Sequence, residues 1–447
     1  MPKTPYWTVY LQVSTYERNL MILTPQGYRA RYVDQEIERS LQVFGAVCVE
    51  GPKWCGKTWA SLNHAQSVFY VGDPSGGFQN RGMAELDPRL ALSGDEPHLI
   101  DEWQEVPPLW DAVRFEVDRA QRTGRFLLSG SSTPQYKGVM HSGTGRIDTI
   151  RMHPMSLYES GDSTGDVSLA RMFDGPIQAV QTGSVSLERL CHLIVRGGWP
   201  GNLQAPSEGE GIVPAGYLRQ VIEQDVGRID GKERDPHKMG LLVRSLARNE
   251  STLSSNATLR RDMREFDDET LAEDTVAEYI ETLHRLFVIY DQPAFDPNMR
   301  SSVRVGKRPK RHLADPSLAA AALRATPSRL MGDLETLGFL FEALCERDLL
   351  VYIGASGGRL YHYRDGNDRE IDAIVELPDG RWGAIEVKLG ANQIDAAAAS
   401  LLRMRDVFKA EPRATTPAFL AVVCGMSSFA YTRPDGVMVV PITALRA

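Results

Sequence analysis

A glycine-rich stretch near the amino terminus carries the residue types best suited to chemistry. The apolar run Val47 to Val49 leads into Gly51-Pro52-Lys53-Trp54-Cys55-Gly56-Lys57-Thr58, and Trp59 to Leu62 can continue as a helix. This is the spacing of a P-loop, in the required order of strand, loop and helix. The glycines let backbone N–H groups face a phosphate, and the helix adds its positive end. All eight residues from Gly51 to Thr58 are therefore expected to contact a nucleotide.

Two residues of this loop have side-chain chemistry of their own. Lys57 is expected to reach the β- and γ-phosphates, which makes it a predicted catalytic residue. The hydroxyl of Thr58 is expected to bind a magnesium ion. ATP and Mg²⁺ are therefore the predicted cofactors.

A second motif supplies two adjacent acids. The apolar run His98 to Ile100 ends in Asp101 and Glu102, and the carboxyl end of a strand is where α/β sheets place their ligands. Asp101 is expected to hold the magnesium ion through a water molecule, and Glu102 to orient or deprotonate the attacking water.

Two further polar positions follow along the chain. Ser129 ends the apolar run Phe126 to Leu128; it is expected to hydrogen-bond the γ-phosphate or the water, and a plain turn is the alternative. Arg146 follows a flexible, glycine-containing loop, and an arginine fork suits a charge clamp. Arg146 is therefore a candidate arginine finger, within its own chain or toward a neighbouring subunit; a surface arginine is the alternative.

The elements that position these residues follow from apolar spacing. Apolar side chains four positions apart predict a helix within residues 28–41, and residues 67–71, 98–102 and 125–132 predict strands. Strands separated by helical patterns imply a mostly parallel sheet with crossover helices. The predicted fold class is α/β.

Length and composition narrow the class of protein. The chain has 447 residues and a net charge of −8, so it has no chain-wide basic surface for nucleic acid, although a local basic patch remains open. Five scattered cysteines without a C-x-x-C pair indicate neither disulfides nor zinc, and no apolar run is long enough for a membrane span. These features favour a cytoplasmic protein. Residues 1–27 are expected to be a disordered extension or a misassigned start, with Met21 as the alternative first residue.

The chain resembles a family of prokaryotic AAA-type ATPases of the AAA+ superfamily, whose C-terminal domain of unknown function is similar to PD-(D/E)XK nucleases. The resemblance rests on the P-loop, Leu99-Ile100-Asp101-Glu102-x-Gln104, Leu127 to Ser131, Gly145-Arg146, His153-Pro154-x-Ser156-Leu157 and Val195-x-Gly197-Gly198-Trp199-Pro200. It implies ATP hydrolysis, with Ser129 in the place of a polar sensor. Trp54, Cys55 and Trp103 replace smaller or aliphatic residues usual in the family, a departure that concerns packing rather than phosphate chemistry.

The middle of the chain reads as helices separated by polar turns, and it resembles the small winged-helix module of family members. It either binds DNA through Arg260, Arg261 and Arg264 or forms a helical lid or spacer beside the nucleotide. Acids crowd the same stretch, which favours the lid or spacer: Asp262, Glu265, Asp267, Asp268 and Glu269. The most basic stretch, Val303 to Arg311, is interpreted as a solvated connector rather than a phosphate contact.

The C-terminal part contains the carboxylates of a nuclease-like arrangement. A helix from Gly338 carries Glu342, and strands are expected at 359–364, 370–375 and 383–388. Asp372 and Glu386, on neighbouring strands, could share a magnesium ion, with Glu342 completing the set. Lys388 lies on the same strand face as Glu386 and is expected to position water or stabilise charge on the phosphate. A hairpin with polar ends is the alternative.

These observations predict four parts: the extension 1–27, an ATPase domain at 28–205, a helical winged-helix-like module at 206–305 and a C-terminal α/β nuclease-like domain at 306–447. The expected function is ATP hydrolysis coupled to a nuclease-like domain acting on DNA or another nucleic acid. The alternative is a nucleotide-controlled switch or scaffold that recruits a protein partner, with a catalytically silent C-terminal domain. Arg146 leaves a homo-oligomer open.

Overall fold

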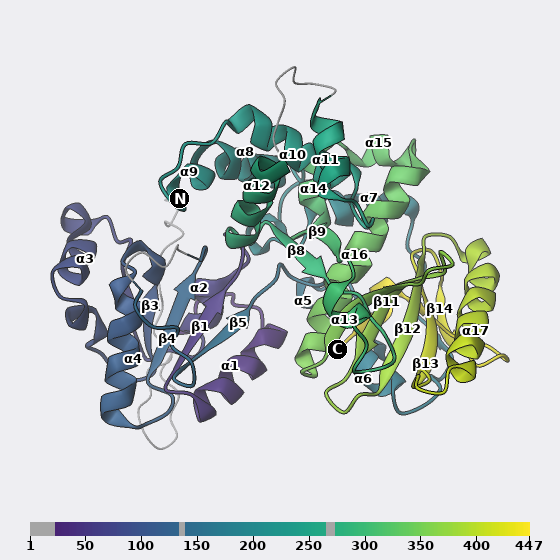
Figure 1. Cartoon of the computed structure of the whole chain (residues 1–447), viewed down its shortest axis with the longest axis horizontal. Helices are drawn as coiled ribbons and strands as arrows, with labels where there is room; N and C mark the ends of the chain where they lie inside the picture. The colour runs from purple at the N-terminus through teal and green to yellow at the C-terminus, as the bar shows by residue number, and fades with distance from the viewer. Residues whose placement is uncertain (1–22, 134–138, 265–272) are drawn as a thin grey trace, which may run out of the picture. The chain divides into compact units, whose positions relative to one another are not determined.

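The computed structural model describes residues 23–133, 139–264 and 273–447. The chain forms two compact units (Figure 1). The first runs to His153 and includes Ile229–Gly231 and Arg285–Phe287, and the second holds the other residues. Most of the expected extension, and the acids Glu265, Asp267, Asp268 and Glu269, lie outside the described residues.

The first unit contains a five-stranded sheet in the order β2-β3-β4-β1-β5. All its strand pairs are parallel, which confirms the predicted α/β architecture. Its strands are β1 (Ala46–Glu50), β2 (Ser67–Tyr70), β3 (His98–Asp101), β4 (Phe126–Gly130) and β5 (Ile147–Arg151). The strand β4 lies between the P-loop strand β1 and the acid-bearing strand β3, so the polar ends of all three strands come to one edge.

One helix precedes the sheet, and three others lie between its successive strands from β1 to β4, where parallel pairing requires crossover connections. They are α1 (Tyr32–Val43), α2 (Lys57–Leu62), α3 (Ser75–Leu86) and α4 (Pro108–Ala120), with short 3₁₀ turns at Pro88–Leu92 and Trp103–Glu105. Apolar side chains of α4, among them Leu109 and Val113, pack with Ile100 and Leu128 of the sheet. Each such buried side chain contributes about 1.5–3 kcal/mol to stability, so this packing fixes the strand ends that carry the polar residues.

The second unit begins with short elements and then becomes helical. The short elements are α5 (Leu157–Ser160), β6 (Val167–Ser168), α6 (Leu169–Met172) and β7 (Val180–Gln181). The helices are α7 (Leu187–Arg196), α8 (Ile212–Gln220), a π-helical turn (Val221–Asp225), α9 (Val226–Arg228), α10 (Pro236–Arg248), α11 (Asn256–Arg264) and α12 (Glu273–Arg285). Arg248 and the side chains of Ser245 and Asn249 all bind Asp262, so α10 and α11 are held together by polar contacts.

A small antiparallel hairpin follows the helices. It pairs β8 (Ile289–Gln292) with β9 (Lys310–Leu313), and α13 (Val303–Gly306) lies between them in the sequence. The hairpin therefore spans the predicted boundary at residues 305 and 306. The interpretation of Val303 to Arg311 as a solvated connector is wrong for three of its cations. Lys310 is completely buried, Arg304 binds Glu376, and Arg311 binds Asp291.

The chain ends in a seven-stranded mixed sheet in the order β10-β11-β12-β13-β15-β14-β7. The strands are β10 (Arg359–Arg364), β11 (Glu370–Glu376), β12 (Trp382–Lys388), β13 (Phe419–Cys424), β14 (Phe429–Thr432) and β15 (Met438–Pro441), and β16 (Leu445–Arg446) pairs with β6. Helix α17 (Ile394–Ala410) packs Leu401 and Phe408 on this sheet. The other helices are α14 (Pro316–Ala322), α15 (Pro327–Met331) and the long α16 (Leu334–Ala355). Over the described ranges, no helix combines the length and apolar character needed to cross a membrane.

Candidate functional site

The P-loop wraps closely against the sheet. A Cβ atom on Gly51 would lie 2.2 Å from the carbonyl oxygen of Met152, so only glycine fits there. Gly56 and Trp54 both have positive φ, 104° and 67°, which turns the backbone sharply before α2. Trp54 is 63% exposed, whereas Cys55 is completely buried. The loop therefore directs its apolar cysteine inward and presents an aromatic ring to solvent.

The lysine of the P-loop is held by the loop itself. The ammonium of Lys57 donates to the carbonyl oxygen of Pro52 over 2.9 Å, and Lys57 is only 5% exposed. Arg31, which the sequence reasoning missed, donates to the carbonyl oxygens of Cys55 and His153, each over 2.9 Å. This guanidinium joins the P-loop to the end of the segment that follows β5. Burial and the nearby Arg151 and Arg31 lower the pKa of His153 to about 3, so its ring stays neutral.

The predicted magnesium ligands lie next to each other. The hydroxyl of Thr58 donates to a carboxylate oxygen of Asp101 over 2.9 Å, and the hydroxyl of Ser129 donates to the same oxygen. Ser129 also accepts from the backbone N–H of Glu102 over 3.3 Å. Burial raises the pKa of Asp101 above its usual range, against the opposing hydrogen bonds and the charge of Lys57. A cation at this edge would favour the ionised form.

The carboxylate of Glu102 is held by two neutral donors. The hydroxyl of Ser131 donates to its Oε2 over 2.8 Å, and the side-chain amide of Gln104 donates to the same oxygen. Gln104 also donates to Ser131 over 3.3 Å. Glu102 itself has φ of 59°, a left-handed backbone conformation that is uncommon for a residue with a side chain. Gln104 belongs to the motif that begins at Leu99, but the sequence pattern alone indicates no role for it.

Arg146 does not join this group. It precedes β5, and its carbonyl oxygen accepts from the N–H of Ala46 at the amino end of β1. The P-loop follows Glu50 at the other end of β1, about 13 Å away along the strand. Arg146 instead binds Asp118 of α4 over 2.8 Å. The expectation of an arginine finger within the same chain is therefore not met by this arrangement, and action on a neighbouring subunit stays a prediction.

A different arginine, Arg151, lies at the carboxyl ends of the strands, where the P-loop also lies. Arg151 ends β5, where its guanidinium lies 3.7 Å from a carboxylate oxygen of Glu50 and 3.8 Å from the ring centre of Phe287. Burial raises the pKa of Glu50, with Arg151 and Lys57 opposing the shift. Arg151 is not among the predicted site residues, because no strand is predicted at 147–151 from the sequence. The two isoleucines Ile147 and Ile150 are the available signal for that strand.

In the C-terminal sheet, the predicted acids and lysine come together. The register Ala373 to Ile385, extended by one residue, places Asp372 opposite Glu386. The ammonium of Lys388 lies 2.6 Å from a carboxylate oxygen of Glu386 and 3.2 Å from one of Asp372. Burial, followed by the charge of Asp372, raises the pKa of Glu386 to about 7. The nearby charge of Asp372 therefore disfavours ionisation of Glu386, and Lys388 offsets this effect only in part.

This group opens onto a cavity of about 420 Å³. Glu386 and Lys388 form one wall, and the start of α17 with the turn before it forms the other. That second wall consists of small or polar side chains: Asn392, Gln393, Ala396, Ala397 and Ser400.

Glu342, the third predicted metal ligand, forms an ion pair with Lys310, a residue of the stretch that was expected to be a solvated connector. The ammonium of Lys310 lies 2.8 Å from Oε1 of Glu342, 3.5 Å from Oε1 of Glu346 and 3.6 Å from Oε1 of Glu370. Burial lowers the pKa of Lys310, but the surrounding carboxylates outweigh it and raise the pKa well above the usual range. Within residues 23–133, 139–264 and 273–447, no group of three or more His, Cys, Asp and Glu side chains is arranged to hold a metal ion.

A buried histidine extends this cluster. His312 of β9 lies 2.9 Å from a carboxylate oxygen of Glu250 and 3.3 Å from one of Glu346. Its other ring nitrogen contacts the amide oxygen of Gln292 at 3.1 Å. Burial lowers the pKa of His312, but the two glutamates prevail and raise it.

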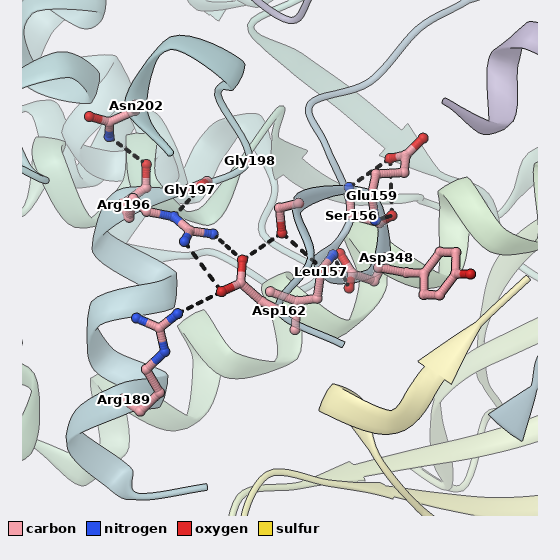
Figure 2. Close-up of polar contacts among 12 residues, drawn as sticks. Ser156, Leu157, Glu159, Asp162, Arg189, Arg196, Gly197, Gly198, Asn202 and Asp348 are labelled. Atoms are coloured by element: carbon pink, nitrogen blue, oxygen red, sulfur yellow. Dashed lines mark hydrogen bonds and ion pairs between the residues drawn. The ribbon is translucent and has the colours of Figure 1, made fainter. Parts of the chain in front are cut away.

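The two remaining sequence motifs form a structural joint in the second unit (Figure 2). Asp162 binds Arg196 and Arg189, each over 2.6 Å, and the N–H of Leu157 donates to Asp348 over 2.9 Å. The N–H of Gly198 donates to Asp315 over 3.0 Å. These hydrogen bonds and ion pairs give the motifs a structural role in the second unit rather than a catalytic one.

A comparison with protein-family models supports the P-loop fold of the first unit. Residues 44–161 match a family model described as "AAA domain". With the P-loop and the parallel sheet, this match identifies an α/β P-loop ATPase domain and supports ATP binding. Residues 187–329 and 337–445 match two models that are each described as a domain of unknown function (DUF8612 and DUF4143). Neither description names a winged helix or a nuclease, so both assignments stay predictions.

Two curated relatives are similar over most of the chain. They are uncharacterized proteins of Mycobacterium bovis (Mb2031c) and Mycobacterium tuberculosis (Rv2008c), each 26% identical over 359 residues, which is 79% of this chain and 72% of theirs. A Walker-type ATPase of Pyrococcus abyssi is 13% identical, covers 65% of this chain and 94% of its own, and has a TM-score of 0.38. A replication initiator DnaA bound to AMPPCP and single-stranded DNA has 12% identity, 57% and 86% coverage, and a TM-score of 0.27. Scores at this level do not indicate a shared overall arrangement.

Proposed function

We propose that this protein hydrolyses Mg-ATP at the edge formed by the P-loop, β3 and β4, and that the nucleotide state controls the activity of its C-terminal region. The observation that carries the proposal is the contact of Thr58 with Asp101, beside Ser129 and a separately held Glu102. These are an oxygen pair suited to magnesium and a carboxylate suited to a water molecule, on neighbouring strands of one sheet.

The residues divide the reaction as follows. P-loop N–H groups bind the phosphates, and Lys57 exchanges its contact with Pro52 for the γ-phosphate. Thr58 and Asp101 would hold Mg²⁺, which neutralises phosphate charge when bound. Water attacks the γ-phosphorus, its proton passes to Glu102, and the bond to the β,γ-bridging oxygen breaks. Ser131 and Gln104 keep one oxygen of Glu102 occupied, which leaves the other for the water.

Replacing Glu102 by Gln tests this assignment. The variant should bind a fluorescent ATP analogue with unchanged affinity but lose about 10²-fold or more in turnover, because the amide cannot accept the proton. Glu105→Gln is the matched control, since Glu105 is exposed and contacts only Arg81 through its side chain in the described structure. Full turnover by Glu102→Gln would remove Glu102 from the mechanism.

For the C-terminal region, we favour action on a phosphodiester of nucleic acid. Support comes from the Asp372, Glu386 and Lys388 group and the cavity beside it. In this proposal the carboxylates would hold a metal ion and Lys388 would stabilise charge on the phosphate. The helical segment 206–305 would transmit the nucleotide state, as a lid or spacer.

A specific observation favours the second candidate, a switch that recruits a protein partner through a silent C-terminal fold. Each predicted metal ligand of this region is already bound by a lysine. Plasmid cleavage with Mg²⁺ and ATP separates the candidates when wild type, Lys388→Ala and the exposed-lysine control Lys409→Ala are compared. Cleavage lost only in Lys388→Ala supports the nuclease, and no cleavage by any of them supports the switch.

A further inference from the structure

Lys310 occupies the centre of the C-terminal carboxylates although it comes from a different segment. It starts β9, within the stretch 187–329 that one family model covers. Its carboxylate neighbours Glu342 and Glu346 of α16 and Glu370 of β11 belong to the stretch 337–445 that another model covers. Two separately recognised segments therefore build one ionic cluster.

The surroundings of this ammonium are those of a cation site. Four oxygen atoms surround Nζ: the three carboxylate oxygens at 2.8, 3.5 and 3.6 Å, and the backbone carbonyl oxygen of Asp372 at 3.5 Å. Both Lys310 and Glu346 are completely shielded from solvent. A buried carboxylate requires a partner charge, and removing that partner is strongly destabilising. The lysine thus supplies the charge that a divalent ion supplies in other oxygen-rich sites.

We propose that Lys310 is the resident cation of this cluster and that it determines which cation the cluster accepts. While the β8–β9 hairpin is in place, its ammonium fills the position among Glu342, Glu346 and Glu370, and a divalent ion is excluded by charge and by space. This bears on the proposed nuclease function without requiring it, because the readout below is metal binding and not cleavage.

The test measures thermal unfolding of the full chain with and without Mn²⁺, in the absence of nucleotide. Lys310→Ala removes the charge and opens space, and Lys310→Met removes the charge but fills the space with apolar atoms. Lys307→Ala, at an exposed position of the same stretch, is the matched control. The nucleotide edge is the same in all four proteins, so differences between them report on the cluster.

The proposal predicts that Mn²⁺ raises the unfolding temperature of Lys310→Ala by more than it raises those of wild type, Lys310→Met and Lys307→Ala, because only Lys310→Ala frees the cluster for a metal ion. By calorimetry, Lys310→Ala should bind Mn²⁺ at least about tenfold more tightly than wild type. Adding Glu342→Gln to Lys310→Ala should abolish the gain. An equal response of wild type and Lys310→Ala, or no response of Lys310→Ala, overturns the proposal.

If Lys310→Ala accumulates in insoluble form, the same comparison is made by refolding from urea. Recovery of folded protein with Mn²⁺ but not with EDTA supports the proposal. Failure to refold under both conditions, while Lys307→Ala refolds under both, shows that Lys310 is a structural ion-pair partner only and contradicts it.

Discussion

The hydroxyl of Thr58 donates a hydrogen bond to the carboxylate of Asp101 over 2.9 Å, although 43 residues separate them in the sequence. The contact joins the first turn of α2 to the end of β3. Ser129 of β4, the strand between β3 and β1, donates a hydrogen bond to the same carboxylate. Three elements therefore bring oxygen atoms together at the place where we propose that a nucleotide-bound magnesium ion is held.

Asp101→Asn should lower ATP turnover by about 10²-fold, because an amide oxygen binds Mg²⁺ less strongly than a carboxylate. The loss should be partly recovered at high Mg²⁺ concentration, which a titration of turnover against Mg²⁺ measures. Thr58→Ser keeps the hydroxyl and should remain close to wild type. Wild-type Mg²⁺ dependence in Asp101→Asn would argue against this ligand.

Gln104→Ala should lower kcat by about tenfold with little change in KM, because Glu102 loses a donor that fixes its carboxylate but the phosphate contacts remain. Steady-state kinetics at saturating Mg²⁺ give both constants. The exposed Gln35 provides the control variant Gln35→Ala. A raised KM with unchanged kcat would show instead that Gln104 acts in nucleotide binding.

Gly198→Ala should destabilise the second unit by about 2 kcal/mol or more, since its Cβ would lie 2.1 Å from the carbonyl oxygen of Met155. The backbone on both sides is held by hydrogen bonds, so neither can move freely. Gly216→Ala is the control: this helical glycine has open space around it, and alanine there should add about 0.5–1 kcal/mol. Urea unfolding compares the two, and equal stability would refute the packing argument.

The raised pKa of Glu386, about 7 compared with 4.5 for an ordinary glutamate, predicts a pH dependence of stability. The folded state binds this proton more tightly than the unfolded state, so the stabilisation is complete below pH 4.5 and is lost as pH rises toward 7. The change is on the order of 3 kcal/mol, since each pKa unit corresponds to about 1.4 kcal/mol. Glu386→Gln should remove this part of the slope in urea unfolding between pH 5 and 8, and an unaltered slope would exclude Glu386 as its source.

Much of the fold could be predicted because its strands are strongly apolar. The predicted strands at 370–375 and 383–388 lie within β11 and β12, and the P-loop pattern located β1 and α2. Apolar runs and glycine spacing are local properties of the sequence, so the strands and the loop that they form can be predicted without knowing the tertiary structure.

The cluster around Lys310 could not be predicted in the same way. A stretch with five cations between residues 303 and 311 reads as solvated, and the carboxylates that bury Lys310 lie 32 to 60 positions further along the chain. The position of Arg146 depends likewise on the register between β1 and β5. Both are long-range properties that one sequence does not specify.

Arg146 lies beside the amino ends of strands β1 and β5, whereas Lys57 begins α2 just beyond the carboxyl end of β1. If hydrolysis requires both, the arginine that completes a given site must come from a second molecule. Mixing the two inactive variants Lys57→Ala and Arg146→Ala would then restore part of the turnover, because some pairings contain one intact combination. Such a protein would hydrolyse little ATP at low concentration and would become active only when its molecules associate.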